Sequence, residues 1–294
     1  MGEYAIKNNS PDSKEIEILL KSKQIAKLAE LLKIDVIHIS EIEEIEPNDP
    51  SKLTGYVTNS WCINSFLDEW NTNAEITVGS HDKQYFTKNE YKLIPLSYPP
   101  SVKCPFPFYL KSASPTKMFT GKVVSHPETL EISNLFSTEK HIPTVAFVYH
   151  PSRLTRQTLE NKNWKNLPHK IFEESNSGLL IGSETMGAIL ISSRDDIPPR
   201  WFGSIVTCEQ ERAIGSNSNP TVLQVAAGII SHLIASLDNP GKGLCMPHDF
   251  DSKTILEIAE PFLGSIVDIN LPFRLPTSWE DLISTKEKMD YDLI

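Results

Sequence analysis

Cysteine and glycine are scarce in this sequence, and neither residue is grouped into a known motif. The 294 residues include 13 glycines and four cysteines, Cys62, Cys104, Cys208 and Cys245, which lie far apart and form no C-x-x-C pair. We therefore expect free thiols and a reducing, cytoplasmic environment. No G-x-G-x-x-G, G-x-x-x-x-G-K-[ST] or G-x-S-x-G motif is present, so nothing indicates a phosphate-binding loop or a serine nucleophile.

Basic residues are also in the minority. Lysine and arginine number 28 against 38 aspartates and glutamates, for a formal net charge of −10. Phosphate backbones and anionic membranes repel an acidic chain, whereas cationic small molecules are compatible with it. No apolar signal peptide follows Met1, and the longest apolar stretch, residues 222–237, is interrupted by Gln224, Ser231 and His232. This stretch is too short and too polar to span a bilayer, so we expect neither a nucleic acid nor a membrane as partner.

Hydrophobic periodicity predicts a mixture of helices and strands around an ordinary core, for which the hydrophobic content of 39% is sufficient. Helical spacing and capping residues, including an Asp12–Glu15 capping pair, predict helices at residues 13–33, 63–70, 219–237 and 251–260. Runs of β-branched and aromatic residues predict strands at residues 34–40, 76–80, 119–125, 144–149, 178–182, 187–192 and 202–207. The helix at 219–237 has Asn219 as N-cap and is apolar nearly all round, so we expect it in the core or at a subunit contact.

Prolines are concentrated at residues 95–115, which carry six of the 21 in the chain. Such a density predicts a long ordered loop and not a central strand. Residues 41–49 are expected to form an acidic loop. The fold class predicted is α+β, with a largely antiparallel mixed sheet covered by helices. The expected organisation is a flexible start at residues 1–12, a single domain at 13–275, and a C-terminal tail with a short helix at 276–294.

An aromatic residue and a carboxylate eight residues apart suggest a site for an organic cation. Trp61 lies in the segment TNSWCINSFLDE, which ends at Glu69. The face of an indole attracts a cation, more strongly where water is excluded, and a nearby carboxylate supplies the opposite charge. The alternative is that Trp61 is an ordinary core aromatic, which is the more frequent environment of a large aromatic side chain.

Two short polar groups follow predicted strands, His81-Asp82 and His126-Pro127-Glu128, and a third, Tyr149-His150, stands at the end of another. Turns at strand ends can present such side chains to a cleft, where they could bind a metal ion, although no spacing among them specifies one. The alternative is that they are solvent-exposed loop residues. Glu184, in the segment GSETMG between two apolar runs, suits either a tight turn or the wall of an active site.

Taken in order, these segments resemble the C-terminal two-thirds of bacterial homospermidine synthase, in the saccharopine-dehydrogenase-like group. The resemblance covers about residues 15–270, and its specificity lies in the order of the motifs. The matching segments are HISE at 38–41, NSW at 59–61 with Phe66 and Glu69, GSHD at 79–82, SHPE at 125–128, YHP at 149–151, GSETMG at 182–187 and WFGS at 201–204. The most specific block comprises Asn219 with LQVAA at 223–227, NP at 239–240, LEIA at 256–259 and PFLG at 261–264.

The resemblance implies the substrate-binding and dimerisation domain of an enzyme that uses NAD to transfer an aminobutyl group from putrescine to a second amine through imine intermediates. By position, Trp61 would be the cation–π surface, and His126 would orient or relay protons. Glu184 would stand where the family usually carries Asp. The implied catalytic residues are Trp61, Glu69, His126, Glu128 and Glu184. The implied substrate-binding residues are Glu41, Trp61, Glu69, Asp82 and Glu128.

The family also carries a nucleotide-binding Rossmann domain ahead of this region, whereas this sequence has no G-x-G-x-x-G motif. Three accounts follow. In the first, a separate Rossmann-domain chain completes a split enzyme. In the second, the chain folds but no longer turns over. In the third, it is a non-catalytic module for polyamines or for a partner protein, which could dock on residues 95–115. We also expect a homo-oligomer, formed through the apolar helix at 219–237.

Overall fold

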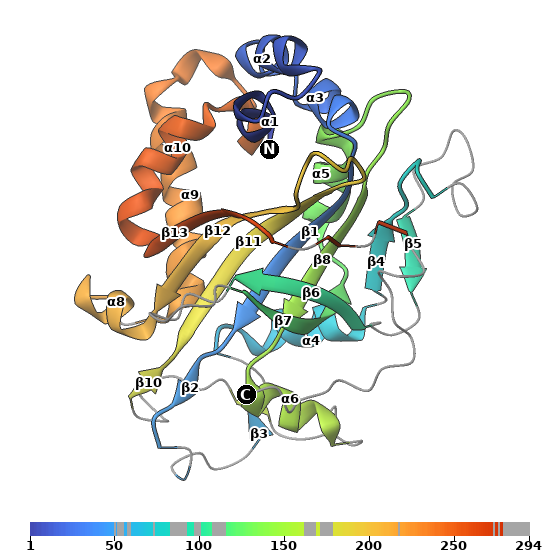
Figure 1. The fold of residues 1–294 in the computed structure, drawn as a ribbon. Helices are drawn as coiled ribbons and strands as arrows, with labels where there is room; N and C mark the ends of the chain where they lie inside the picture. The colour runs from blue at the N-terminus through green and yellow to red at the C-terminus, as the bar shows by residue number, and fades with distance from the viewer. Residues whose placement is uncertain are drawn as a thin grey trace.

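The computed structural model describes residues 1–49, 51, 56–57, 60–72, 74–82, 93–96, 101–107, 116–161, 169–170, 179–216, 218–272, 274–275 and 277–278. A nine-stranded sheet lies at its centre, in the order β13-β12-β11-β1-β8-β4-β5, and the β6–β7 hairpin joins β8 through β7 (Figure 1). Strands β1 and β8 are parallel, and the other pairs in this sheet are antiparallel. The predicted α+β fold with a largely antiparallel mixed sheet is therefore confirmed.

The strands of this sheet are β1 (Ile34–Glu43), β4 (Ala74–Thr77), β5 (Leu93–Leu96), β6 (Ser101–Pro107), β7 (Thr116–Val124), β8 (Thr144–His150), β11 (Ser183–Ser192), β12 (Arg200–Thr207) and β13 (Ser265–Asn270). Two small ladders pair β2 (Glu46–Pro47) with β10 (Leu180–Ile181) and β3 (Tyr56–Val57) with β9 (His169–Lys170). The α-helices are α1 (Gly2–Lys7), α2 (Ser13–Lys21), α3 (Ile25–Leu31), α4 (Ile63–Asn71), α5 (Pro127–Leu135), α6 (Arg153–Glu160), α8 (Cys208–Ala213), α9 (Pro220–Asp238) and α10 (Ser252–Ala259). Short 3-10 helices are η3 (Pro240–Lys242), η4 (Pro247–Asp249) and η5 (Glu260–Phe262).

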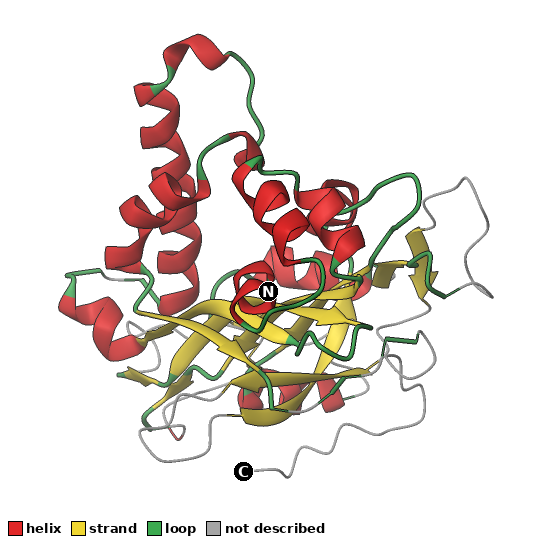
Figure 2. Cartoon of the chain, turned by 45° about the horizontal axis from the view of Figure 1, so that its top comes forward, coloured by secondary structure: helices red, strands yellow, loops and turns green. Residues whose placement is uncertain are grey.

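Alternation along β1 divides its side chains between two faces of the sheet. Ile37 packs in a core with residues of α1, α2 and α3, and Ile39 also packs against the aromatic residues of α4. Because alternate side chains of a strand share a face, Glu41 and Glu43 lie on this same helix-covered face. Figure 2 shows the N-terminal helices and the α9–α10 pair on one side of the sheet.

The opposite face is closed by a tryptophan that lies over two glycines. Trp201 is fully buried and packs with Val36 and Ile189. Gly187 and Gly203 are ladder partners on β11 and β12. A Cβ atom on either glycine would lie 2.6 Å from the Trp201 ring. Both positions therefore require glycine so that the indole can approach the backbone.

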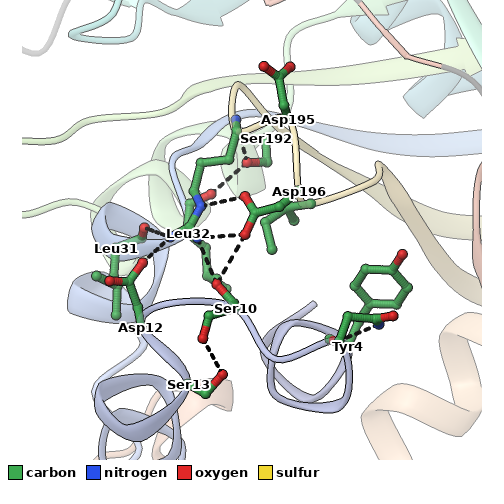
Figure 3. A network of polar contacts seen from close by, with 12 residues as sticks. Tyr4, Ser10, Asp12, Ser13, Leu31, Leu32, Ser192, Asp195 and Asp196 are labelled. Carbon is green, nitrogen blue, oxygen red and sulfur yellow. Dashed lines mark hydrogen bonds and ion pairs between the residues drawn. The ribbon is translucent and has the colours of Figure 1, made fainter.

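Arg194, in the turn between β11 and β12, fixes the N-terminal helices to the sheet, and Figure 3 shows its partners Ser10, Asp12 and Asp196 together. Its guanidinium group donates to Asp12 at 2.6 Å and to Asp196 at 2.7 Å. The Arg194 side chain is only 16% exposed, so these charge-assisted bonds are screened less than those of a surface pair. Residues 1–12, which we expected to be a flexible start, accordingly contain helix α1, whose Ala5 is buried.

The single helix predicted at residues 13–33 is interrupted. Helices α2 and α3 are separated at Lys23, which has a left-handed φ of 53° that a helix cannot contain. The predicted capping pair of Asp12 and Glu15 was also wrong. Asp12 occupies the N-cap position of α2 but makes no side-chain cap bond, because its carboxylate is paired with Arg194.

Two segments predicted to be loops contain strands. Strand β1 extends to Glu43, so the start of the expected acidic loop at 41–49 belongs to the sheet. Within the proline-rich residues 95–115, β6 pairs with β7 in a hairpin, and its prolines are tolerated because β6 has only this partner among the described strands. The rest of that segment after β5, and most of the tail expected at 276–294, lie outside the described residues.

The helix predicted at 219–237 is α9, and the other predicted helices and strands are found with boundaries shifted by a few residues. Asn219 caps α9 by accepting the N–H of Val222 at 2.9 Å. By length and composition alone α9 could cross a membrane. However, it bonds to the sheet through two buried polar residues, Thr221 to Glu184 and Gln224 to Ser204. A helix with such a buried polar side packs on protein.

Candidate active site

Five glutamates gather on the helix-covered face, and we call them the acidic cluster: Glu41, Glu43, Glu69, Glu128 and Glu184. Glu41 and Glu43 end β1, and Glu184 is the ladder partner of Glu43 on β11. Glu69 comes from α4, and Glu128 from the first turn of α5. Their charges act on one another: burial raises the pKa of Glu41 and the charge of Glu69 adds to it, and burial raises the pKa of Glu69 with a smaller contribution from Glu128. The fold therefore brings together carboxylates that lie far apart in the sequence.

Glu43 is held by three hydrogen-bond donors. Ser60 donates its backbone N–H at 2.8 Å and also its hydroxyl group, and the Tyr149 hydroxyl group donates at 2.7 Å. Tyr149 is in reach because it is the ladder partner of Glu41 on β8. Burial raises the pKa of Glu43, while the bonds from Ser60 and Tyr149 lower it. Three donors give this carboxylate the best support for a negative charge among the buried members.

Glu184 has no exposed surface and much less support. The Thr221 hydroxyl group, in the first turn of α9, donates to Oε2 at 3.0 Å. The Oε1 atom has no hydrogen-bond partner among the described residues. Burial, followed by the charges of Glu41 and Glu43, raises the pKa of Glu184 well above its ordinary value. A buried carboxyl oxygen without a donor is costly, and it indicates a partner that belongs there.

A histidine is the one basic ion-pair partner of the acidic cluster among the described residues. No lysine or arginine in this part of the chain forms an ion pair with any of its members, and its one ion-pair partner is His126, which bonds Glu128. Burial, followed by the charges of Glu69 and Glu43, raises the pKa of Glu41 to about 8. The cluster is thus short of positive charge, which a cationic ligand would supply.

His126 connects the helical members of the cluster to the sheet. Its ring stacks on Phe147 of β8, with the ring centroids 4.0 Å apart, and its Nδ1 atom bonds Glu128. This bond lowers the pKa of Glu128. Burial raises the pKa of Glu69, and the charge of His126 partly offsets that effect. An imidazole between two carboxylates can move a proton at this end of the site.

Trp61 lies at the edge of the acidic cluster. It is partly buried and packs against Phe66 of α4 and Tyr149 of β8. Its neighbour Ser60 bonds Glu43, which fixes the start of this segment to the cluster. The indole Nε1 atom is buried and has no hydrogen-bond partner among the described residues. Trp61 is therefore neither a fully buried core aromatic nor a free surface residue.

We expect Glu41→Gln to change how stability depends on pH. Because the folded-state pKa of Glu41 is raised to about 8, the folded protein binds more protons than the unfolded chain between the ordinary glutamate pKa and about 8. The stability contributed by this group is therefore lost as pH rises through that range. Melting temperatures should show no gain from the variant at about pH 5 and a clear gain at about pH 8.5. A constant difference across this range would contradict the raised pKa.

The structure does not bring Asp82 to the acidic cluster. Asp82 follows β4, whose end lies beside the start of β8, because the N–H of Gly79 donates to Thr144 Oγ1 at 2.8 Å. Glu41 and Tyr149 lie at the other end of β8. The geometry therefore gives Asp82 no part in the same site. Among the described residues, no group of three or more His, Cys, Asp or Glu side chains is placed to hold a metal ion.

Comparisons with known proteins point to one enzyme. No family model matches the chain. It is 26% identical over 259 residues to homospermidine synthase from Mesorhizobium japonicum, covering 82% of this chain and 51% of that protein. It is 24% identical over 263 residues to the same enzyme from Blastochloris viridis, covering 83% and 52%. The crystal structure of homospermidine synthase from Legionella pneumophila in complex with NAD matches with a TM-score of 0.72 and 27% identity, covering 84% of this chain and 55% of that one.

The domain is a mixed sheet with carboxylates gathered under its helices. In sequence and in fold, this chain resembles homospermidine synthase, as the order of its motifs predicted. It spans about half the length of the curated relatives that it matches.

Proposed function

We propose that this chain forms the amine-binding part of a cytoplasmic, homospermidine synthase-like transferase, which moves an aminobutyl group from putrescine to a second amine with NAD as cofactor. The observation that carries the proposal is the unpartnered Oε1 atom of Glu184 within five gathered glutamates. A diammonium ion supplies both the positive charge and the N–H donors that such a site lacks. The resemblance to homospermidine synthase supports putrescine as that ion.

In this proposal the carboxylates of the sheet and the carboxylate of α4 bind the two nitrogens of the diamine. Glu41 and Glu184 on the sheet bind one nitrogen, and Glu69 on α4 receives the other. Carboxylates fixed in this way stabilise positive charge as it develops on a carbon–nitrogen unit. The indole of Trp61 covers the alkyl chain and the ammonium group and excludes water. His126, bonded to Glu128, takes up and returns a proton as the amines change protonation.

The described residues do not fit the phosphates of a dinucleotide. They contain no glycine-rich loop, and the acidic cluster repels phosphate. We therefore propose that a nucleotide-binding unit outside these residues holds NAD, on a second chain if the enzyme is split. Held there, NAD would supply the acceptance and return of hydride. A non-catalytic polyamine-binding module would share this amine site but would not retain NAD. Native mass spectrometry of the complex distinguishes the two through a second subunit and bound NAD.

Trp61→Ala should lower the affinity for putrescine by about 10-fold, since a cation–π contact in a desolvated site is worth about 1–2 kcal/mol. Trp61→Phe keeps an aromatic face and should retain most of the affinity. Phe262→Ala, which removes an exposed aromatic of η5, serves as the control. Isothermal titration calorimetry measures all three. Equal affinities for the wild type and Trp61→Ala would remove Trp61 from the site.

The outer side of α9 supports self-association. Seven large apolar side chains of this helix are between 38% and 70% exposed: Val222, Val225, Ile229, Ile230, Leu233, Ile234 and Leu237. Monomeric proteins rarely expose a continuous apolar stripe of this kind. We propose that a second copy of the chain covers it in a two-fold symmetric dimer.

Ile229→Glu combined with Leu233→Glu should convert this dimer to a monomer, because burying two carboxylates without partners opposes association. Light scattering coupled to size-exclusion chromatography reports the mass. Lys140→Glu, at an exposed position between α5 and β8 and outside this stripe, should leave the mass unchanged. A monomeric wild type would contradict the proposed dimer.

A further inference from the structure

Two carboxylates of the acidic cluster cannot both be charged while the site is empty. Glu43 and Glu184 face each other directly across the β1–β11 ladder, and neither side chain has any exposed surface. Like charges directly opposite on a ladder repel, and burial removes the water that would screen them. Within the described part of the chain, no lysine or arginine forms an ion pair with either carboxylate. One of the two therefore holds a proton until a cation enters.

The hydrogen bonds distinguish the charged member from the neutral one. Glu43 accepts two bonds from Ser60 and one from Tyr149, and several donors stabilise an ionised carboxylate. Glu184 accepts one bond, from Thr221, and its Oε1 atom has no partner among the described residues. The negative charge therefore belongs on Glu43, and the proton on Glu184.

Further carboxyl groups, together with one tyrosine, one histidine and one threonine, surround this pair. They are Glu41 on β1 and Glu44 after it, Tyr149 on β8, Glu69 on α4, His126 and Glu128 on α5, and the uncharged Thr221 on α9. On β7, Lys122 is the ladder partner of Tyr149, and burial lowers the pKa of its ammonium group. Burial and the neighbouring carboxylates set the raised pKa values of Glu41 and Glu184. Glu41 is 9% exposed and lies two residues before Glu43 on the same face of β1, so repulsion from the charge of Glu43 favours a second proton there.

We propose that the acidic cluster exchanges protons for an alkylammonium ion, with Glu43 as the positioning residue whose fixed charge keeps Glu41 and Glu184 protonated in the empty protein. When the ammonium group enters, Glu41 and Glu184 ionise and their protons pass to the solvent. The N–H groups of the amine then donate to the freed carboxylate oxygens. The inference rests on the proposed function in one respect, namely that the cation is an amine. It implies a site that is close to neutral when empty and charged only when it is filled.

Calorimetry with putrescine measures the exchange directly. Titrations in phosphate and in Tris, which differ in ionisation enthalpy, give the number of protons released for each putrescine bound. We expect about one proton or more at about pH 7, and a smaller number at about pH 9.5, where more of the cluster is ionised before binding. Binding that releases no protons at about pH 7 would overturn the inference.

Glu43→Gln tests the positioning role. Without the charge at residue 43, Glu41 and Glu184 ionise at lower pH, so the number of protons released at about pH 7 should fall by about half or more. Glu43→Asp keeps the charge and should restore the wild-type number. Glu46→Gln, whose carboxylate is bonded to Arg153 outside the cluster, is the matched control and should change nothing. Equal proton release in the wild type and Glu43→Gln would contradict the role of Glu43.

The inference and the proposed function fail in different ways. Putrescine that binds without releasing protons contradicts the inference alone. An absence of binding heat contradicts the proposed function, and the infrared spectrum of the empty protein then tests the protonation itself. At about pH 7 we expect the C=O absorption of a protonated carboxyl group, weakened in Glu184→Gln. A wild-type spectrum without this absorption would overturn the inference.

Discussion

Glu184→Gln will lower the affinity for putrescine by about 100-fold, which corresponds to about 2.7 kcal/mol. The substitution keeps the shape of the side chain and an oxygen for the bond from Thr221, but it removes the negative charge. Losing one partner of a buried, hydrogen-bonded charge pair costs roughly 2–5 kcal/mol. Glu184 has no exposed surface, so water cannot replace the lost partner. Isothermal titration calorimetry measures the change.

A matched control separates this effect from the general loss of a carboxylate. Glu30 on α3 is partly buried and, like Glu184, accepts a hydroxyl bond, here from Thr138 at 2.6 Å, but it lies outside the acidic cluster. Glu30→Gln should leave the affinity for putrescine within about 2-fold of the wild type. Similar losses in Glu30→Gln and Glu184→Gln would mean that the affinity responds to overall charge and not to this site.

Gly203→Ala will reduce the free energy of unfolding by about 3 kcal/mol, near the upper end of the cost of overpacking a core. The added Cβ atom would lie 2.3 Å from the carbonyl oxygen of Met186 and 2.6 Å from the Cα atom of Gly187. Both are backbone atoms of the neighbouring strand, and they cannot move without opening the β11–β12 ladder. The indole of Trp201, 2.6 Å from the added Cβ atom, prevents that atom from moving away from the strand.

Gly228→Ala is the control for Gly203→Ala. Gly228 lies inside α9, and a Cβ atom there would meet nothing within 4 Å. Alanine should therefore stabilise the protein by up to about 1 kcal/mol, through its greater helix propensity. Urea denaturation of both variants gives the two free energies. A Gly203→Ala variant as stable as the wild type would mean that the sheet relaxes around the added methyl group.

Elements with strong local signals could be predicted from the sequence. The start of α9 is fixed by Asn219 as N-cap and Pro220 in the first turn, and the structure has the helix where these residues place it. Strand β8 is a short run of apolar and β-branched residues that is buried almost throughout, and it too was predicted. In both cases, neighbouring residues alone carry the information.

The end of β1 could not be predicted in this way. Glu41 and Glu43 are poor strand formers and are rarely buried, so the sequence around them favours a loop. The structure places them in the ladder because β8 and β11 pair with β1 on its two sides. Local preference and tertiary pairing disagree most clearly at functional sites. Here the disagreement falls on Glu41 and Glu43, two members of the acidic cluster.

The same limitation explains which members of the acidic cluster could be grouped from the sequence. The order of the motifs brought Glu41, Glu69, Glu128 and Glu184 into one predicted site, and the structure gathers all four. Glu43 was missed because its place opposite Glu184 depends on the register of β1 and β11. Asp82 was included because its motif falls in sequence order, although strand direction carries it to the other end of the sheet. Register and direction are properties of pairing between distant segments, and a single sequence does not contain them.

A crystal structure of the protein with putrescine tests the central claim most directly. We predict one nitrogen of the diamine within hydrogen-bond distance of Glu184 Oε1 and of Glu41, with the alkyl chain against the indole of Trp61. Putrescine bound elsewhere, or a filled crystal in which Glu184 Oε1 still has no partner, would contradict the claim that these buried carboxylates form an amine site.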